Sequence, residues 1–378
     1  MIKVMHIING LETGGAELAL SRLLSFSDRS CFEMQVISLV GDGPVGDIIR
    51  AAGIRVHCLG MSRNFPDVPE LIRLVRLLRQ QKPDVVQTWL QQSDLLGGIA
   101  AKLAGVAPVL WNIRHSTMHT SYIKRKTRAI THICAWLSGM LPTRIVCCSE
   151  RSKEEQRKIG YADYKLIVIP NGIDTGRFTI DLGARSDVRN ELQVQPDTIL
   201  IGASGRFHPQ KDYRNFIRAA QKICVACPTA VFAMCGDNVR LSNPEIACWV
   251  ADTGFADRFR VLGRRNDMPR FMAGLDIFVS TSAFGEGFPN VVAEAMACGV
   301  PCVVTDVGDS ARIVGTTGKV VSPEAPAALA DACLQLIGFG SGYLRKCGAD
   351  ARDRIVTNFS MQRMESQYEH LYRQAATA

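Results

Sequence analysis

The sequence predicts an α/β protein made of two domains, each built on a parallel sheet. Short apolar segments alternate with amphipathic helical patterns along the chain, an order that is typical of parallel sheets with helices on both faces. The 378 residues are too many for one typical domain and suit two. The segment Asn171–Asp174 places a turn sequence after a strand pattern, and a polar run follows it. We therefore predict a first domain over residues 1–170 and a second domain that starts at residue 171.

The composition is typical of a globular protein with reduced thiols. Hydrophobic residues make up 47% of the chain and charged residues 21%, and no apolar run approaches the roughly 20 residues that span a bilayer. The start, MIKVMHIING, lacks a small-residue cleavage site, so we predict no signal peptide. The 13 cysteines are an odd number and many lie in apolar runs, which favours buried thiols in a cytoplasmic protein. Cys224 and Cys227 form an isolated C-x-x-C inside a helical pattern, and we interpret them as core residues.

Most of the net charge of +8 lies in one stretch of the first half. Residues 95–149 contain no Asp or Glu, and their seven basic residues are Lys102, Arg114, Lys124, Arg125, Lys126, Arg128 and Arg144. Nucleic-acid binding is disfavoured, because no interleaved aromatic residues and no recognisable motif accompany this charge. The cluster from Lys124 to Arg128 precedes an apolar segment that is too short to span a bilayer. This pattern is typical of a helix on an anionic membrane surface, and equally of a solvated helix face beside a core helix.

The segment Ser280–Asp306 has the pattern of a strand end, a glycine loop, a helix and a second strand. Gly285 and Gly287 lie on either side of a glutamate in the loop, and Pro289 suits the first turn of the helix. Glycines let the backbone approach a ligand closely, and the first helical turn directs free N–H groups and a positive dipole end at it. We therefore predict an anion-binding site here, with phosphate as the expected ligand.

Two carboxylates lie in this segment. Glu286 is in the glycine loop and Glu294 is in the helix. Each carboxylate accepts two hydrogen bonds and so suits a pair of neighbouring hydroxyls on a sugar or a ribose. Either residue alone could instead be an ordinary surface group. Glu294, however, is the single charge within the apolar run 291–297, and a charge in such surroundings needs a partner, which favours a functional role.

The two glutamates also carry a resemblance. The segment FGEGFPNVVAEAMACGVPCVVTDVGD resembles the E-x7-E signature of glycosyltransferase family 4, whose members are retaining, nucleotide-sugar-dependent enzymes of the GT-B fold. The resemblance implies two Rossmann-like domains that face each other across a cleft. It also implies that a last helix over 358–378 crosses back to the first domain, so that the second domain covers 171–357. Glu286 would hold hydroxyls of the donor sugar, and Glu294 would hold those of the ribose.

Segments that follow other predicted strands of the second half also suit the binding of a nucleotide-sugar donor. The segment SGRFHPQKD follows a predicted strand and resembles the family's G-R-x4-K motif, which binds the donor diphosphate. Arginine offers a planar fork to two phosphate oxygens and lysine offers a point charge. The segment Gly263–Asp267 resembles the base-binding loop, whereas Asn238 stands where the family more often has a glycine. The predicted donor-binding residues are Gly15, Gly205, Arg206, Lys211, Gly263, Arg264, Glu286, Gly287, Phe288, Pro289, Asn290 and Glu294.

The first half contributes two weaker motifs. The segment Gly14–Glu17 is not the dinucleotide fingerprint G-x-G-x-x-G, so a nicotinamide-type enzyme is disfavoured. It resembles the family's G-G-x-E loop, which implies that Gly14 and Glu17 border the acceptor. Arg114 and His115 follow a predicted strand; the resemblance places the histidine at the donor's sugar and phosphate, and we assign the arginine to the acceptor. His119 lies four residues on, but no third ligand accompanies this pair, so a metal site is disfavoured.

These motifs predict a metal-independent glycosyltransferase. No Asp-x-Asp occurs, so Arg206, Lys211 and the amides of residues 287–290 would neutralise the leaving diphosphate. With Glu286 and His115 they form the predicted catalytic set. The resemblance implies retention. Together with the acid-free stretch 95–149, it suggests a polyprenyl-diphosphate-linked glycan acceptor at the inner face of a bacterial membrane. We expect a UDP-sugar donor in preference to a GDP-sugar. A sugar-nucleotide epimerase of similar fold and a non-catalytic nucleotide-sugar-binding protein are the alternatives.

Overall fold

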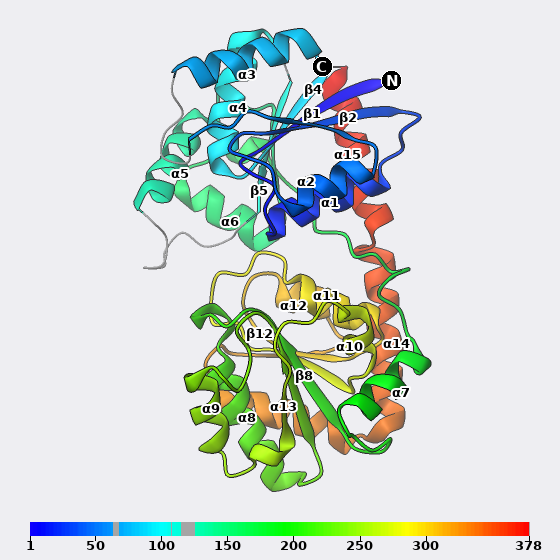
Figure 1. Ribbon diagram of the computed structural model, residues 1–378. Helices are drawn as coiled ribbons and strands as arrows, with labels where there is room; N and C mark the ends of the chain where they lie inside the picture. The colour runs from blue at the N-terminus through cyan, green and yellow to red at the C-terminus, as the bar shows by residue number, and fades with distance from the viewer. Residues whose placement is uncertain (63–67, 107, 115–124, 378) are drawn as a thin grey trace. The chain divides into compact units, whose positions relative to one another are not determined.

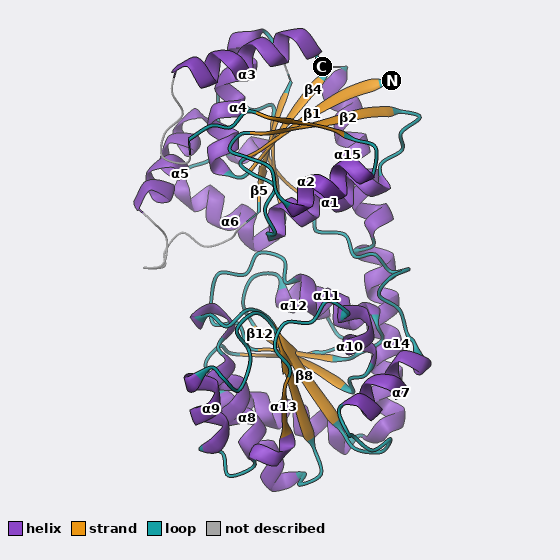
Figure 2. Ribbon diagram, viewed as in Figure 1, coloured by secondary structure: helices purple, strands orange, loops and turns teal. Residues whose placement is uncertain are grey.

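The structure, a computed structural model, describes residues 1–62, 68–106, 108–114 and 125–377. The chain forms two compact α/β units (Figure 1). One unit comprises Met1–Gly172 together with Met361–Ala378, and the other comprises Ile173–Ser360. In each unit, helices flank a sheet of strands (Figure 2).

The first unit contains a seven-stranded parallel sheet in the order β3-β2-β1-β4-β5-β6-β7. Its strands are β1 (Ile2–Ile8), β2 (Phe32–Ser38), β3 (Arg55–Cys58), β4 (Val85–Trp89), β5 (Val109–Ile113), β6 (Arg144–Cys147) and β7 (Leu166–Val168). Its helices are α1 (Gly15–Phe26), α2 (Pro44–Ala51), α3 (Val68–Gln81), α4 (Gln91–Ala104), α5 (Arg125–Leu137), α6 (Glu150–Ile159) and α15 (Met361–Ala376), with a short 3-10 turn at Asp163–Lys165. The central strands are almost continuously buried, as expected of a parallel sheet covered on both faces.

The last helix belongs to the first unit. Helix α15 packs an apolar face, which includes Tyr368 and Tyr372, against the sheet. The buried hydroxyl of Tyr372 donates to Gln87 on β4, and Asn112 on β5 donates to the hydroxyl of Tyr368 at 2.9 Å. These contacts confirm the predicted return of the last helix to the first domain.

The second unit contains a six-stranded parallel sheet in the order β10-β9-β8-β11-β12-β13. Its strands are β8 (Leu200–Ser204), β9 (Val231–Cys235), β10 (Phe259–Val261), β11 (Ile277–Ser280), β12 (Cys302–Thr305) and β13 (Lys319–Val321). Its helices are α7 (Leu182–Glu191), α8 (Tyr213–Ala226), α9 (Pro244–Ala251), α10 (Met268–Ala273), α11 (Asn290–Ala297), α12 (Ser310–Val314), α13 (Pro326–Gly338) and α14 (Gly340–Asn358), with 3-10 turns at Pro209–Lys211 and Ala256–Arg258.

The strand order gives each sheet a switch point. In the first unit the order reverses between the neighbours β1 and β4, and in the second unit it reverses between β8 and β11. Loops that leave the carboxyl ends of two such strands diverge to opposite faces of the sheet, and the crevice between them is where ligands of open α/β sheets bind. The loop after β8 carries Arg206 and Lys211, and the loop after β11 carries Glu286. The topology therefore brings the strongest sequence motifs of the second half to one place.

Candidate functional site

Two loops meet at the switch point of the second sheet. The amide of Ala283, after β11, donates to the carbonyl of Gln210 at 2.8 Å. The hydroxyl of Thr281 donates to the carbonyl of Lys211 at 2.7 Å. These two contacts to backbone carbonyls fix the two loops against each other, so the side chains that they carry converge.

An ion pair lies where the loops converge. The ammonium of Lys211 donates to Oε1 of Glu286 at 2.5 Å. The hydroxyl of Ser282 donates to the same oxygen at 2.8 Å. The side chains of Lys211 and Glu286 are 19% and 10% exposed, so the pair is largely desolvated but open on one side. A cation and a hydrogen-bond acceptor side by side suit a ligand that presents a phosphate next to a hydroxyl.

Ser282 is a site residue that the sequence analysis missed. Its side chain is 1% exposed, and its carbonyl accepts a hydrogen bond of 2.6 Å from the hydroxyl of Thr305 on β12. The bond from Thr305 thus fixes the backbone of Ser282, while the hydroxyl of Ser282 orients Glu286. Its position just after the end of β11 is a sequence signal, but serine is too common at strand ends for that signal to be specific.

Close backbone approaches shape the crevice. A Cβ on Gly236, after β9, would lie 1.8 Å from the carbonyl oxygen of Gly205, after β8. A Cβ on Gly308, after β12, would lie 2.6 Å from the carbonyl oxygen of Glu286, and the φ of Gly308 is +62°. Larger residues would push the neighbouring loops apart at either position. Gly308 was not among the predicted site residues, although it also follows the carboxyl end of a strand.

The base-binding motif lies on the same edge of the sheet. The amide of Gly236 donates to the carbonyl of Gly263 at 2.8 Å, and the amide of Gly205 donates to the carbonyl of Cys235 at 3.0 Å. These bonds bring together the loops that follow β8, β9 and β10. Asn238 has a φ of +58°, a left-handed conformation that asparagine tolerates better than most residues. Its backbone therefore fits where a glycine is more usual.

The cations around this edge differ in their surroundings. Arg206 and Arg264 are exposed, and neither makes a hydrogen bond or ion pair with any other residue in the described ranges. Arg265 instead bonds Glu191 at 2.6 Å and Asp267 at 2.6 Å. Arg265 is therefore held by the protein, whereas Arg206 and Arg264 are available to a ligand.

Helix α11 begins next to the ion pair. Its first residue is Asn290 and Pro289 is the N-cap, so the helix begins one residue later than predicted. Gly287, Phe288 and Pro289 are buried. Glu294 is 7% exposed, within a helix whose other side chains are mostly buried against the sheet. The predicted segment thus forms the expected strand, loop, helix and strand.

In the first unit, Gly14 is the N-cap of α1, whose first residue is Gly15. A Cβ on Gly14 would lie 2.3 Å from Oε2 of Glu17, so glycine leaves room for this carboxylate to fold back over the helix start. Partial burial raises the pKa of Glu17. A glutamate at a helix N-terminus is favoured by the helix dipole, and this one remains a candidate contact for a hydroxyl-bearing ligand.

Arg114 follows β5 and is held from two sides. Nη2 donates to Oδ1 of Asn171, and the guanidinium lies 5.4 Å from the centroid of the Trp89 ring. Nη1 is buried without a hydrogen-bond partner among the residues that the structure describes. Arg114 therefore has a fixed direction, and among the described residues nothing accepts a hydrogen bond from its Nη1. His115, the predicted catalytic histidine, lies outside the described residues.

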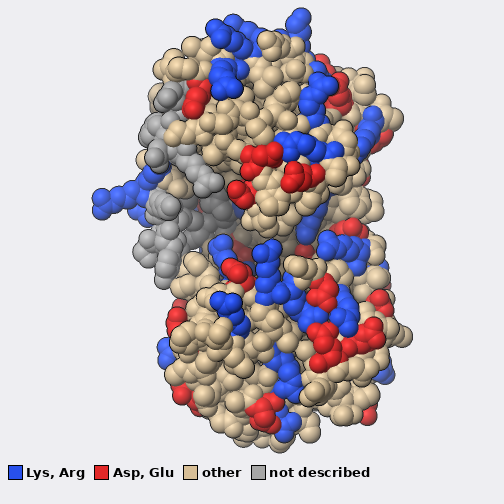
Figure 3. All heavy atoms as spheres, in the orientation of Figure 1, with Lys and Arg blue, Asp and Glu red and all other residues tan. Residues whose placement is uncertain are grey.

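The predicted membrane-surface residues lie at the start of α5. Arg125, Lys126 and Arg128 are exposed, and Lys124 lies outside the described residues. Acidic and basic side chains intermingle over the visible face of the second unit (Figure 3). The stretch that contains α5 is different, because it carries positive charge without any acidic residue.

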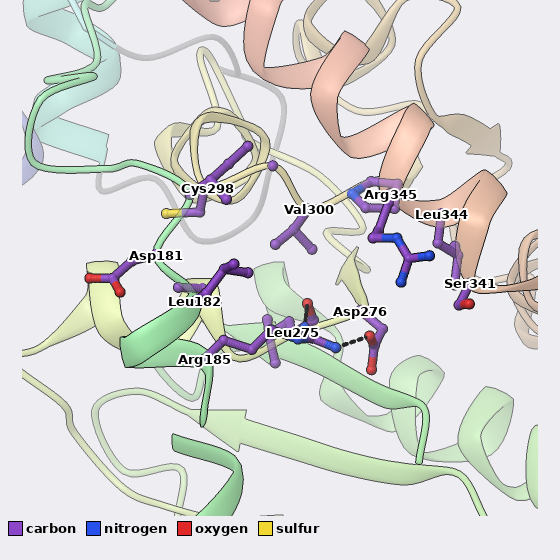
Figure 4. Close-up of a pocket in the computed structure, with 14 residues that line it drawn as sticks. Asp181, Leu182, Arg185, Leu275, Asp276, Cys298, Val300, Ser341, Leu344 and Arg345 are labelled. Atoms are coloured by element: carbon purple, nitrogen blue, oxygen red, sulfur yellow. Dashed lines mark hydrogen bonds and ion pairs between the residues drawn. The ribbon is translucent and has the colours of Figure 1, made fainter. Parts of the chain in front are cut away.

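A pocket of about 230 Å³ lies away from this site (Figure 4). Its walls come from α7, α14 and the turns that precede β11 and β12, so it opens at the amino-terminal edge of the second sheet. An ion pair of 2.5 Å between Arg185 and Asp276 lies in its wall. Because the predicted motifs all lie at the carboxyl edge, this pocket is not the predicted donor site.

Other features bear on earlier predictions. All 13 cysteines are free thiols, and Cys224 is buried. In the described ranges, no group of three or more His, Cys, Asp or Glu residues is arranged to hold a metal ion. No single helix among those described is long and apolar enough to cross a membrane; α13 and α14 meet that test only as a pair, which is bent by 107°.

Comparison with known proteins assigns both halves to one class. Residues 13–177 match the family model described as Glycosyltransferase Family 4, and residues 198–338 match the model described as Glycosyl transferases group 1. The chain is 31% identical over 275 residues to the UDP-Gal:alpha-D-GlcNAc-diphosphoundecaprenol alpha-1,3-galactosyltransferase of Escherichia coli, an alignment that covers 71% of this chain and 69% of the relative.

Two further similarities extend over more of the chain. The capsular polysaccharide biosynthesis glycosyltransferase CapM of Staphylococcus aureus is 25% identical over 335 residues, which is 84% of each protein. The crystal structure of Anabaena HepE in complex with UDP superposes with a TM-score of 0.87 at 21% identity and covers 99% of this chain and 100% of that chain. The fold is GT-B, as the motifs implied, and the chain belongs to glycosyltransferase family 4 and is a glycosyltransferase.

Proposed function

We propose that this glycosyltransferase moves a sugar from a UDP-sugar to a hydroxyl of a polyprenyl-diphosphate-linked glycan, with retention at the anomeric carbon and without a metal ion. The observation that carries the proposal is the pairing of Lys211 with Glu286 at the switch point of the second sheet. The name of the Escherichia coli relative specifies UDP-Gal as donor and a diphosphoundecaprenol-linked acceptor, and Anabaena HepE structures hold UDP and UDP-glucose. Both support a UDP-sugar and a lipid-linked acceptor here.

The donor would lie along the carboxyl edge of the second sheet. Lys211, exposed Arg206 and the amides at the start of α11 would bind the diphosphate, with the helix dipole adding to their charge. Glu286 would accept hydrogen bonds from the sugar hydroxyls and Glu294 from the ribose. The loop at Gly263 and Arg264 would meet the uracil. In this arrangement the leaving diphosphate lies among cations while the sugar is held by a carboxylate.

The chemical step would depend on positioning and on stabilisation of the leaving group. The acceptor hydroxyl would attack the anomeric carbon from the face that the diphosphate leaves, and its proton would pass to a diphosphate oxygen. Charge on that oxygen would be stabilised by the largely buried Lys211 and the exposed Arg206, which would act on it together. Cationic side chains of the protein would neutralise the leaving diphosphate in place of a metal ion, consistent with the lack of any Asp-x-Asp in the sequence. His115 would contact the sugar and phosphate, and Glu17 and Arg114 would border the acceptor.

The acceptor determines where in the cell the enzyme would act. A polyprenyl-linked glycan is anchored in a bilayer, so the enzyme would work as a peripheral protein at the inner face of the cytoplasmic membrane. The basic cluster Lys124, Arg125, Lys126 and Arg128 would approach anionic lipid there.

Nucleotide release from a panel of UDP- and GDP-sugars, with and without a chelator, tests this function. We expect UDP release from one sugar, stimulated by a polyprenyl-diphosphate-linked acceptor and unchanged by chelator, with the anomeric configuration of the donor kept in the product by NMR. Loss of turnover with chelator would disprove metal independence, and an inverted product would disprove retention. A released epimer without acceptor would favour an epimerase, and tight binding without turnover on any acceptor would favour a binding protein.

Ser282→Ala is expected to lower kcat/KM about 10-fold to 100-fold, because a hydrogen bond to a charged group contributes about 1.5–3 kcal/mol. Ser282→Thr, which keeps the hydroxyl, should recover most of the activity. Ser310→Ala is the matched control: Ser310 is also 1% exposed, but its hydroxyl donates to the carbonyl of Val307 at 2.7 Å. If Ser282→Ala and Ser310→Ala had equal, small effects, Ser282 would not position Glu286.

A further inference from the structure

A histidine caps the short turn that carries Lys211. The turn Pro209–Lys211 follows β8, and His208 is its N-cap. Nδ1 of His208 accepts a hydrogen bond of 3.1 Å from the amide of Gln210. The carbonyl of His208 accepts a second bond, of 2.9 Å, from the amide of Lys211. The usual capping residues are Ser, Thr, Asp and Asn, so a titratable histidine in this position calls for an explanation.

The capped residue also joins the two loops of the site. The amide of Gln210 donates to His208, and the carbonyl of Gln210 accepts from the amide of Ala283, after β11, at 2.8 Å. The carbonyl of the next residue, Lys211, accepts from the hydroxyl of Thr281 at 2.7 Å. The cap therefore acts on the backbone segment from which the lysine side chain reaches its carboxylate partner.

The capping bond requires one form of the imidazole ring. A ring nitrogen that accepts a hydrogen bond carries no proton, so the proton of the neutral ring lies on Nε2 of His208. The protonated ring has a donor at both nitrogens and cannot accept from the amide of Gln210. The cap is thus made by neutral His208 and is lost when the ring takes up a proton.

The charges around the turn favour the neutral ring. Partial burial, together with the positive charges of Arg206 and Lys211, lowers the pKa of His208 from its ordinary value of 6.5. The acidic groups near the turn have other partners: Glu286 pairs with Lys211 at 2.5 Å, and Asp212 caps the start of α8. The ring is therefore mainly neutral at pH 7, and the cap is in place.

We propose that His208 is a positioning residue for sugar transfer: its neutral ring holds the turn that directs Lys211 at the donor diphosphate, and protonation of the ring releases this turn. The inference rests on the proposed function, in which Lys211 stabilises the leaving diphosphate. It adds a residue that lies between Arg206 and Lys211 in the sequence but is neither of the charged positions of that motif.

Two amide substitutions separate the capping role from a direct contact with the donor. Asparagine places its side-chain oxygen close to the position of Nδ1 and is a favoured N-cap, whereas glutamine places its polar atoms near the position of Nε2. We expect His208→Ala and His208→Gln to lower kcat about fivefold to tenfold, the change that loss of a cap makes in a conformational equilibrium. His208→Asn should keep the parent's kcat at pH 8. Full activity in His208→Gln with loss of activity in His208→Asn would assign a direct contact through Nε2 and would overturn the proposal.

The pH dependence of kcat separates positioning from a general loss of structure. Between pH 8 and pH 5 the parent protein should lose activity as pH falls through the pKa of His208, and His208→Asn should stay active to lower pH, because asparagine does not titrate. His57→Asn is the matched control: His57, on β3, is also half-buried, and burial also lowers its pKa. This control should have the parent's profile. An unchanged acid limb in His208→Asn, or the parent's kcat in His208→Ala, would contradict the positioning role.

NMR separates this inference from the proposed function, because it needs no turnover. In protein labelled with 15N-histidine, the ring signals of His208 are those that His208→Asn lacks, and they should report a neutral ring protonated at Nε2. Hydrogen exchange at the amide of Gln210 should be about fivefold to tenfold faster in His208→Ala. A neutral ring protonated at Nδ1, or unchanged exchange at Gln210, would disprove the cap.

The two failures have different signatures. If the proposed function fails, the parent protein releases no nucleotide from any donor, while the NMR results still decide whether His208 holds the turn. If this inference alone fails, the parent protein transfers sugar and His208→Ala transfers it equally fast.

Discussion

Lys211→Met is expected to lower kcat for sugar transfer by about two to three orders of magnitude, the cost of removing one preorganised electrostatic contact to a developing charge. The ammonium lies at the switch point, 2.5 Å from Glu286, and is 19% exposed. Its charge therefore acts in partly desolvated surroundings, where it is worth more than in water. Nucleotide release at saturating donor measures kcat. Lys222→Met, which removes an exposed lysine from α8, is the control and should have the parent's kcat.

The same substitution has a consequence for folding stability. Lys211→Met leaves Glu286 largely buried without its cation, and Glu286→Gln leaves the cation without its carboxylate. Each single change should lower the free energy of unfolding by about 1–3 kcal/mol. The double variant should lose less than the sum of the two, because neither charge is then left unpaired. Additive losses in urea denaturation would show that the pair does not couple, and a kcat within threefold of the parent for Lys211→Met would remove Lys211 from the site.

The sequence predicted the two α/β units, the return of the last helix and the strand–loop–helix–strand segment of the second half. Local signals sufficed for the two units and for the segment of the second half, because glycine, proline and apolar periodicity act over a few residues. The return of the last helix was implied by the family resemblance instead. The contact between Lys211 and Glu286 joins residues that are 75 positions apart. This contact depends on β8 lying beside β11, and the sequence of neither loop indicates the order of the strands in the sheet.

Side-chain environments were the least predictable part. The apolar run after Lys126 indicated either a membrane-facing or a core helix, and periodicity alone did not show that α5 buries Cys134 in the first unit and exposes Trp136. Ser282 and Gly308 were missed because serine and glycine are ordinary at strand ends. Their function is defined by which neighbouring loop the fold brings against them.

A buried carboxyl group in the first unit was missed for a similar reason. Asp94 lies in the first turn of α4, where an aspartate usually faces solvent and stabilises the helix. Here it is fully buried, Oδ1 accepts a hydrogen bond of 2.5 Å from the hydroxyl of Thr88, and Oδ2 has no partner in the described part of the chain. Burial raises the pKa of Asp94 to about 8, although the bonds from Thr88 and from the amide of Asn112 lower it in part.

Asp94→Asn is therefore expected to make the protein more stable at pH 8 and to leave its stability near pH 4 almost unchanged. Folding raises the pKa of Asp94 from 3.8 to about 8. The contribution of Asp94 to folding stability is therefore present below pH 4 and is lost as pH rises towards 8. The slope of this loss is at most about 1.4 kcal/mol per pH unit. Asparagine has nearly the shape of the neutral acid and does not ionise, so the slope should disappear.

Urea denaturation of the parent and of Asp94→Asn between pH 5 and pH 8 measures this difference. Burial lowers the pKa of His6 to about 3, so its contribution to stability is lost as pH falls below 6.5, the opposite direction. Because His6 is present in both proteins, its contribution cancels in the comparison. Asp47→Asn, at a side chain that is 82% exposed, controls for the loss of one acidic group and should follow the parent. If Asp94→Asn and the parent had the same slope, Asp94 would be ionised in the folded protein, and an unpaired buried charge would have to be tolerated at Oδ2.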